Sequence, residues 1–544
     1  MCGICLLWNH SASDPFPKYE MHACVQRLLD RGPDDAASDL LTLASGIRIG
    51  IGFTRLHVQG AAGQEQPFRL ADGRIVMCNG EIFNAPELVS SLSLPVAKGA
   101  SDCAVIPALL TTMGLDLDAV CRLLDGDFAI VVLDPIAATV TVARDPYGVR
   151  PLFLGSYDSG ISCIASELKG FPLHMGPLIS VEAIEPGTVV TVPLGNPTKR
   201  VTTRWHQVPW LKSPHFASMA AGPALQFALE AAVVKRLATV RELGACLSGG
   251  LDSSLIAAIA ARNITGPLHT YSIGMEGSPD LENARLVAAH IGSIHHERVV
   301  TAEECLAAIP RVIRAIESFD ITTVRASVGN YLLGEFIKRV TPTVKVILNG
   351  DGADEILGGY LYMRAAPSDA AFEAETTRLL EEIHRYDVLR SERSMAAHGL
   401  ESRSPFLDRQ FVAVARGLPT ALLRPSPTKI EKHVLRAAFE ASGLLPAAVL
   451  WRPKEAFSDG ISRAEKSWFE TARARGEEEF PDGFATAFTI NPPKTAEAAW
   501  YRSLFHESYP EIAASLIPAM WMPRFIAGAT DPSARTLALY GPPK

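Results

Sequence analysis

Residues 241–262 read RELGACLSGGLDSSLIAAIAAR, and this stretch decides the fold of the second half of the chain. Arg241–Leu247 is the pattern of a buried strand, and Ser253–Arg262 has the composition of a helix. The loop between them contains two adjacent glycines, which allow backbone N–H groups to approach phosphate oxygens closely. The N-terminus of the following helix adds positive potential. The spacing is not the Walker pattern, because no GxxxxGK motif is present.

The sequence around this loop indicates two domains. From residue 220 onward strands alternate with helices, and His269–Ile273 and Val344–Leu348 are further strands that end at glycine-containing loops. This alternation predicts a parallel α/β sheet that binds ligands at the carboxyl ends of its strands. The first 200 residues are instead rich in short strands, including Ala129–Leu133 and Thr139–Ala143, with a hairpin turn at Asp134-Pro135. We place the domains at residues 1–205 and 206–544.

Composition excludes several classes of protein. The chain has 544 residues, 48% of them hydrophobic, and a net charge of -8, which argues against a general nucleic-acid or membrane-surface binder. No signal peptide or membrane span is visible. Nine cysteines without clustering or metal-binding spacing do not predict a disulfide framework or a zinc site. A reducing, cytoplasmic setting fits best.

Cys2 is the first candidate catalytic residue. Removal of Met1 leaves it with both a thiol and a free α-amine, and the amine can serve as the base for the thiol. Taken alone, position 2 is more simply explained as a small residue, so the interpretation depends on what accompanies it.

Five further residues support a catalytic role for Cys2. Arg55 follows a predicted strand and can bind a carboxylate with two hydrogen bonds, although most arginines form surface ion pairs. Asn79-Gly80 follows the predicted strand Ile75–Met77 and is either a simple turn or an oxyanion hole. Glu81 and Asp102 can bind an α-ammonium group, and Asp102 can alternatively cap the helical stretch Cys103–Thr112.

Together these residues resemble the class II glutamine amidotransferases, whose fold is an N-terminal-nucleophile (Ntn) sandwich of antiparallel sheets. The matching pieces are Cys2–Ile4, Arg31–Asp34, Arg55–Leu56, Gln66–Pro67, Asn79–Ile82, Ser101–Asp102, Arg144–Asp145 and Gly148–Leu152. The resemblance implies that Cys2 is the nucleophile and that Asn79 and Gly80 form the oxyanion hole. It also implies a glutamine site made of Arg55, Leu56, His57, Val58, Gln59, Asn79, Gly80, Glu81 and Asp102.

The loop Ser248–Ser254 resembles the pyrophosphate loop of the ATP-pyrophosphatase enzymes. Further matches at Gly358–Tyr360, Pro405–Asp408, Lys432–His433, Trp451–Gly460 and Asp531–Thr536 narrow the resemblance to the glutamine-hydrolysing asparagine synthetases, close to their eukaryotic form. It implies that aspartate, glutamine and ATP are converted to asparagine, glutamate, AMP and pyrophosphate. The implied ATP-binding residues are Cys246, Leu247, Ser248, Gly249, Gly250, Asp252, Ser253, Ile273, Asn349 and Gly350.

The resemblance also assigns roles around the transferred groups. Thr322, Thr323 and Arg325 belong to a segment implicated in aspartate and pyrophosphate handling, and Lys454 provides a charge for the phosphoryl group. Asp252 and Asp354 are expected to hold Mg²⁺. Without this resemblance, Arg325 and Lys454 are read as a helix-entry arginine and a solvated loop lysine.

One segment departs from the family pattern. Residues 349–355 read Asn-Gly-Asp-Gly-Ala-Asp-Glu, where the family usually has Ser-Gly-Glu-Gly-Ser-Asp-Glu. Asp351 is one methylene shorter than the usual Glu, and a displacement of about 1 Å costs as much as ~10²-fold in rate if nothing compensates. Its carboxylate still suits a role as acid or base.

Two alternatives stand beside the synthetase interpretation. One is a related ligase such as a β-lactam synthetase, which the intact Cys2 and the Thr322–Ser327 segment disfavour. The other is a non-catalytic binding protein, supported only by the changes at Asn349, Asp351 and Ala353. The expected partners are small-molecule substrates, with no nucleic acid or membrane. The sequence leaves the oligomeric state open, with a homodimer among the candidates.

Overall fold

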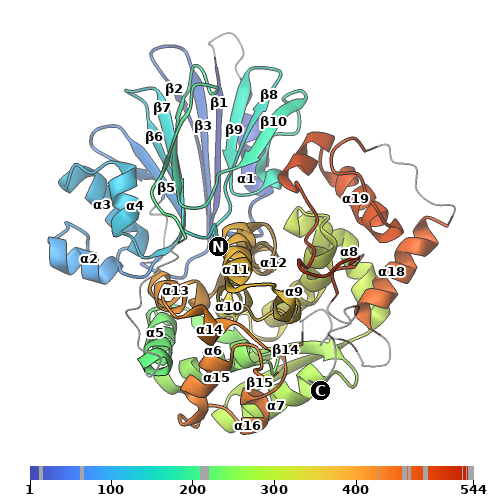
Figure 1. Cartoon of the computed structure of the whole chain (residues 1–544). Helices are drawn as coiled ribbons and strands as arrows, with labels where there is room; N and C mark the ends of the chain where they lie inside the picture. Colours follow the sequence, from blue (N-terminus) through green and yellow to red (C-terminus); the bar gives the residue numbers. More distant parts are fainter. Residues whose placement is uncertain are drawn as a thin grey trace.

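The computed structural model describes residues 1–10, 16–61, 66–208, 220–426, 428–455, 462, 467–481, 488–529, 531–533 and 536. Two antiparallel sheets stand above an α/β half in Figure 1, and the N-terminus lies where the two halves meet. Within the described residues, no helix is long and apolar enough to cross a membrane.

The N-terminal half contains two six-stranded antiparallel sheets. The first has the order β10 (Leu178–Ala183), β8 (Phe153–Tyr157), β9 (Ile161–Ala165), β1 (Gly3–Asn9), β3 (Arg48–Arg55), β2 (Asp35–Thr42). The second has the order β12 (Val201–Arg204), β11 (Thr188–Pro193), β7 (Thr139–Arg144), β6 (Gly126–Asp134), β5 (Ile75–Ile82), β4 (Phe68–Arg69). The predicted hairpin at Asp134-Pro135 is confirmed, because β6 and β7 pair with Asp134 opposite Thr139.

Alternation of side chains along the strands produces four layers. On β1, Ile4 and Leu6 face the core between the sheets, whereas Cys5 and Leu7 face the opposite way and pack with residues of α1 (Lys18–Gln26). On the outer face of the second sheet pack α2 (Ala85–Leu92), α3 (Val105–Thr112) and α4 (Leu117–Leu123). The predicted Ntn sandwich is therefore present.

The C-terminal half is built on a parallel sheet, as predicted. Its order is β15 (Ile294–Val300), β14 (His269–Met275), β13 (Glu242–Cys246), β16 (Val344–Leu348), β17 (Glu401–Arg403), and every neighbouring pair is parallel. One face packs with α5 (Ala221–Lys235), α6 (Leu251–Asn263) and α7 (Pro279–Ile291). The other packs with α8 (Ala302–Ile316) and α9 (Ile321–Val340).

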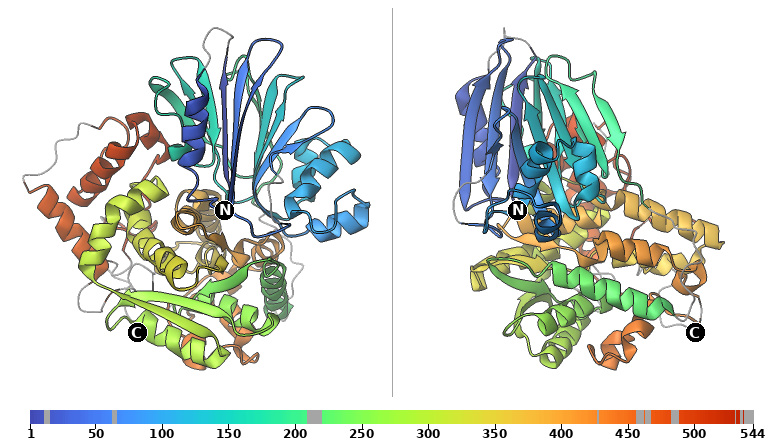
Figure 2. Two further views of the ribbon diagram at one scale, coloured as in Figure 1. Left: turned by 180° about the vertical axis from the view of Figure 1, so that it is seen from behind. Right: turned by 90° about the vertical axis from the view of Figure 1, so that its left-hand side faces the viewer.

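The remaining helices surround this sheet. They are α10 (Ala353–Leu357), α11 (Asp369–Glu382), α12 (Asp387–Ala396), α13 (Arg409–Arg416), α14 (Thr420–Leu423), α15 (His433–Glu440), α16 (Ala447–Leu450), α18 (Trp468–Glu479) and α19 (Ala496–Ser508). Seen from behind in Figure 2, α18 and α19 lie beside α8. Between the halves, β12 ends at Arg204 and α5 begins at Ala221, and residues 209–219 lie outside the described residues.

The structure excludes two of the alternatives given for the candidate residues. Asn79-Gly80 is not a turn after a strand, because β5 continues to Ile82 and places Gly80 opposite Phe128 of β6. A Cβ on Gly80 would lie 2.2 Å from the carbonyl oxygen of Asp127, so glycine here allows the two strands to approach. Asp102 is not the helix cap, because the Ser101 side chain accepts the hydrogen bond from the Cys103 N–H.

The two glycines of the loop after β13 have different structural roles, and this difference predicts different mutant stabilities. Gly249 has a φ of +68°, and a Cβ there would lie 2.5 Å from the backbone nitrogen of Ala284 on α7. Gly249→Ala is expected to lower the free energy of unfolding by about 2–4 kcal/mol. Gly250→Ala is the matched control, because its nearest neighbour would be Ser248 Oγ at 3.3 Å. Thermal melts in which both variants shift equally would contradict this assignment.

Candidate functional site

Cys2 and Asn79 lie in direct contact at the base of the sandwich. The Cys2 backbone nitrogen donates to Asn79 Oδ1 at 3.0 Å. Asn79 Nδ2 is buried and has no hydrogen-bond partner among the described residues, so a donor is left available beside Cys2. The thiol of Cys2 accepts a hydrogen bond from the Leu56 backbone N–H. The fold therefore brings Cys2 together with Asn79 of β5, whose amide donor is available.

Burial controls the protonation of this site. It raises the pKa of the Cys2 thiol to about 11 and lowers the pKa of the α-amine, here on Met1, to about 6. At neutral pH the thiol is therefore protonated and the amine is largely neutral. A protonated thiol requires a base, and the α-amine that Cys2 carries after removal of Met1 can supply one.

Two carboxyl groups lie near Asn79. Asp102 Oδ2 accepts from the Ile82 N–H at 2.6 Å, and burial raises the pKa of Asp102 to about 6. Burial and the neighbouring Asp102 charge also raise the pKa of Glu81 well above its usual range. Glu81 forms an ion pair at 3.2 Å with Arg403 of β17, a residue of the other domain. The predicted pair of carboxyls is thus assembled, with a cation that the sequence analysis did not include.

The segment Arg55–Gln59 lies between the two domains. Arg55 ends β3, and its Nη2 donates to the carbonyl oxygens of Gln59 and Ala61. Gln59 Nε2 donates to the Ala238 carbonyl at 2.9 Å, and Val58 packs in a cluster with Val346. His57 Nε2 lies 2.9 Å from the Gly60 carbonyl oxygen. These contacts direct the Val58 and Gln59 side chains toward the second domain, and the Leu56 side chain packs in the same cluster with Val346.

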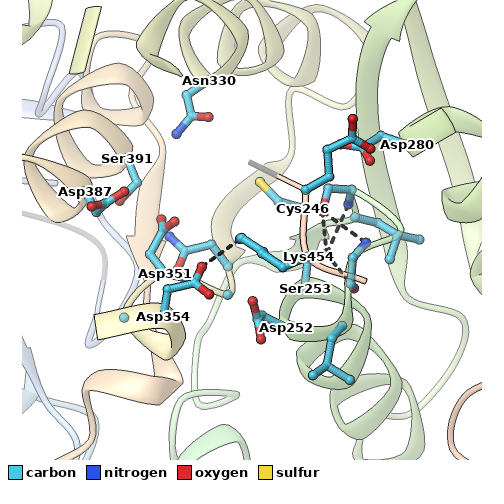
Figure 3. Close-up of a pocket in the computed structure, with 18 of the residues that line it drawn as sticks. Cys246, Asp252, Ser253, Asp280, Asn330, Asp351, Asp354, Asp387, Ser391 and Lys454 are labelled. Carbon is cyan, nitrogen blue, oxygen red and sulfur yellow. Dashed lines mark hydrogen bonds and ion pairs between the residues drawn. The ribbon is translucent and has the colours of Figure 1, made fainter. Parts of the chain in front are cut away.

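A second site lies at the carboxyl ends of the parallel strands, in a pocket of about 140 Å³. Figure 3 shows Asp252, Asp354 and Lys454 pointing toward one another inside it. Of the residues predicted to bind ATP, those that line it are Cys246, Leu247, Ser248, Gly250, Asp252, Ser253, Ile273, Asn349 and Gly350. Gly249 packs instead against α7, as described above.

Two lysines and two aspartates form a chain of ion pairs in this pocket. Lys432 Nζ lies 2.5 Å from Asp252 Oδ2 and 2.5 Å from Asp354 Oδ1, and Lys454 Nζ lies 2.6 Å from Asp354 Oδ2. Although burial opposes ionisation, the two lysines hold the pKa of Asp354 below its usual range. Asp354 in turn raises the pKa of Lys454. Asp252 Oδ1 is buried and lacks a partner among the described residues.

Hydrogen bonds from neighbouring side chains hold the loop at 349–355, which departs from the family pattern. Asn349 Nδ2 donates to Ser402 Oγ at 2.6 Å, and Ser404 Oγ donates to Asn349 Oδ1 at 2.8 Å. Asn349 Oδ1 also accepts from the Asp351 N–H. The Asp351 carboxylate accepts from Arg390 of α12 at 2.9 Å, which fixes the shorter side chain in the pocket. Burial raises the pKa of Asp351.

Arg325, predicted to bind aspartate or pyrophosphate, is bonded to carboxylates of the protein itself. Its guanidinium forms paired hydrogen bonds with Glu497 and with Asp531, so two carboxylates of the chain itself occupy its donors. Thr323 Oγ1 donates to Asp320, whereas Thr322 Oγ1 is buried without a partner among the described residues. These residues line a second hollow of about 100 Å³, which shares Tyr360, Asp387 and Arg390 with the larger pocket.

Several residues of the two sites escaped sequence reasoning. Lys432 lies in a quoted motif, Lys432–His433, but received no role, although it bridges the two predicted metal ligands. Arg390 and Arg403 carry no motif of their own that assigns a function. Their partners are distant in sequence, so only the folded chain reveals them. Residues 456–460 of the Trp451–Gly460 motif lie outside the described residues.

The fold and the two sites define a class of protein, an amidotransferase sandwich joined to a parallel-sheet synthetase. Two family models match the chain: the Glutamine amidotransferase domain over residues 1–222, and Asparagine synthase over residues 224–374 and 363–520. Asparagine synthetase (glutamine-hydrolyzing) of Gallus gallus is 40% identical, and the proteins of that name from Bos taurus and Homo sapiens are 39% identical. Each comparison covers 99% of both chains. The chain belongs to the glutamine-hydrolysing asparagine synthetases.

Proposed function

We propose that this chain makes asparagine from aspartate in an ATP-dependent reaction, with glutamine as the nitrogen donor. Membership of the family supports this assignment, since relatives of that name match over 99% of the chain. The observation that carries it is the contact between Cys2 and Asn79, where Oδ1 orients the cysteine backbone and Nδ2 remains available. A buried amide donor with no partner is costly unless a ligand satisfies it.

In the first reaction, Cys2 Sγ attacks the carboxamide carbon of glutamine after Met1 has been removed. The α-amine takes the thiol proton and delivers it to the departing ammonia. Asn79 Nδ2 and the Gly80 N–H stabilise the negative oxygen of the tetrahedral intermediate. Glu81 and Asp102 bind the substrate ammonium, and Arg55 binds its carboxylate. Water then hydrolyses the γ-glutamyl thioester to release glutamate.

In the second reaction, the β-carboxylate of aspartate attacks the α-phosphorus of ATP, and pyrophosphate leaves. The loop Ser248–Ser253 binds the pyrophosphate through backbone N–H groups and hydroxyls. Lys454, already charged beside Asp354, stabilises the negative charge that develops on the leaving group. Ammonia then attacks β-aspartyl-AMP, Asp351 accepts a proton from it, and AMP leaves as asparagine forms.

The donors of this pocket fit Mg²⁺. Asp252 and Asp354 present carboxylate oxygens, the ligands that this ion prefers, and the buried Asp252 Oδ1 has no partner among the described residues. Mg²⁺ held by these two residues would neutralise the charge of the pyrophosphate. Lys432 keeps the two carboxylates together, because its ammonium lies between them.

We further propose that ammonia passes between the sites inside the protein and that the enzyme works in the cytoplasm. Strand β17 supports the first point: Ser402 lines the ATP pocket, while its neighbour Arg403 contacts Glu81 of the glutamine site. Strand β17 therefore lies between the two sites. An enclosed passage prevents protonation of ammonia, which would remove its nucleophilic lone pair.

Cys2→Ala separates the two reactions. We expect asparagine synthesis from glutamine to fall by on the order of 10³-fold or more, because the thioester cannot form. Synthesis from ammonium chloride should continue, because the ATP pocket is untouched. The measurement follows asparagine, AMP and pyrophosphate from each nitrogen source. Glutamine-dependent synthesis that survives in Cys2→Ala would remove Cys2 from the mechanism.

The raised pKa of Asp102 predicts the pH dependence of glutamine use. This carboxyl group, with a pKa of about 6 caused by burial, is protonated and unable to pair with an ammonium below that value. We therefore expect kcat/KM for glutamine hydrolysis to rise roughly tenfold per pH unit below pH 6 and to level off above it. A profile that falls as pH rises from 5 to 7 would contradict the role of Asp102.

A further inference from the structure

Strand β17 presents opposite faces to the two sites. It has three residues, Glu401, Ser402 and Arg403, and successive side chains of a strand point in opposite directions. Ser402 bonds to Asn349 in the ATP pocket. Glu401 and Arg403 face the other way, and both are buried, with 3% and 0% of their surfaces exposed. A residue of the synthetase domain is thus placed against the glutaminase domain.

Arg403 is held firmly by its own domain. Its Nε donates to Glu401 at 2.8 Å, and its Nη1 donates to the carbonyl oxygens of Arg236 and Ala238 at 2.8 and 2.7 Å. The remaining end, Nη2, lies 3.2 Å from Oε2 of Glu81. Because three donors fix the guanidinium, its position decides where the Glu81 carboxylate lies.

Arg403 opposes the protonation of Glu81. Burial and the charges of Asp102 and Glu401 raise its pKa, whereas Arg403 and Arg150 oppose that rise. These four residues are the charged groups with the largest effects on Glu81. Removing the nearer cation would favour the protonated acid, which cannot bind an ammonium through charge.

A second buried contact crosses the domain boundary at Cys2. Arg31 Nε donates to the Cys2 carbonyl oxygen at 2.9 Å, and Arg31 Nη2 forms an ion pair at 2.5 Å with Glu392 of α12. Glu167 is the other ion-pair partner of Arg31. Arg31 and Glu392 are nearly inaccessible to solvent, with 0% and 2% of their side-chain surfaces exposed. The motif Arg31–Asp34 received no role in the sequence analysis, and this contact supplies one.

We propose that Arg403 and Glu392, both in the synthetase domain, are positioning residues of the glutaminase site. Arg403 acts through Glu81 on the ammonium end of glutamine, and Glu392 acts through Arg31 on the backbone of Cys2. The proposal rests on the proposed function, because it takes Glu81 as a glutamine ligand and Cys2 as the nucleophile. The glutaminase site is therefore complete only while the two domains are docked.

Two variants of the full-length chain test this proposal. Arg403→Lys keeps a positive charge but cannot reach all four partners, and Glu392→Gln keeps the side-chain volume while removing the charge. We expect Arg403→Lys to raise KM for glutamine roughly tenfold, the effect of one charge-assisted hydrogen bond. We expect Glu392→Gln to lower kcat for glutamine hydrolysis by a similar, roughly tenfold factor. Synthesis from ammonium chloride should be unchanged in both.

Asp125→Asn is the matched control. It removes a different ion pair across the same boundary, that of Asp125 with Lys235 at 2.6 Å, and its side chain contacts neither site. Both activities should be unchanged in this variant. Glu392→Gln is the more conservative of the two test variants and decides the proposal if Arg403→Lys does not fold.

A double-mutant cycle and a pH profile exclude a merely structural role for Arg403. If Arg403 acts through Glu81, adding Arg403→Lys to Glu81→Gln should leave KM for glutamine where Glu81→Gln alone puts it. In Arg403→Gln, which removes the charge, the rising limb of kcat/KM should move to higher pH, because Arg403 holds down the pKa values of both Asp102 and Glu81. Additive effects on KM, an unmoved pH limb or an equal loss of ammonia-dependent synthesis would each overturn the inference. A wild-type chain that hydrolyses no glutamine would overturn the proposed function as well.

Discussion

Buried charge at the boundary between the two domains is the constraint on which the structure depends. A charge removed from water is tolerated only when it is paired, because its desolvation costs several kcal/mol. Arg31, Arg236 and Arg403 are each almost inaccessible to solvent. Arg236 is paired with Asp408 at 2.9 Å and faces Asp127 of the sandwich at 3.8 Å. Since partners of each charge come from both domains, the observed docking is what neutralises all three.

This docking brings two chemically different sites close together. The glutamine site lies at the end of an antiparallel sandwich, where burial raises the pKa of the Cys2 thiol and keeps it protonated. The ATP pocket lies at the carboxyl ends of parallel strands, where alternating lysine and aspartate side chains accumulate charge for a phosphorylated substrate. β17 borders both sites, so a single short strand links the geometry of one to the other.

Compensation explains how the unusual loop at 349–355 remains compatible with the family chemistry. Asn349 is larger and more polar than the serine usual at this position, and Ser402 and Ser404 satisfy its amide. Asp351 is shorter than the usual glutamate, and Arg390 holds its carboxylate in the pocket. The serines lie on or directly after β17 and the arginine lies on α12, so neither compensation can be recognised by reading the loop alone.

The sequence by itself determined what depends on local backbone geometry and on side-chain alternation. The strand, glycine loop and helix at 241–262 and the hairpin at Asp134-Pro135 follow from short motifs, whereas the grouping of Cys2 with Asn79 came from the family resemblance. The extension of β5 through Asn79-Gly80 did not follow from a short motif, because strand pairing with β6 overrode the local turn preference. Only the tertiary structure decided the partners of charged groups. Lys432 and Asp252 are 180 residues apart, and Arg325 and Asp531 are 206 apart. Such pairs form because buried charges must be neutralised. The two partners need only be close in the folded chain, so their pairing produces no periodic pattern in the sequence.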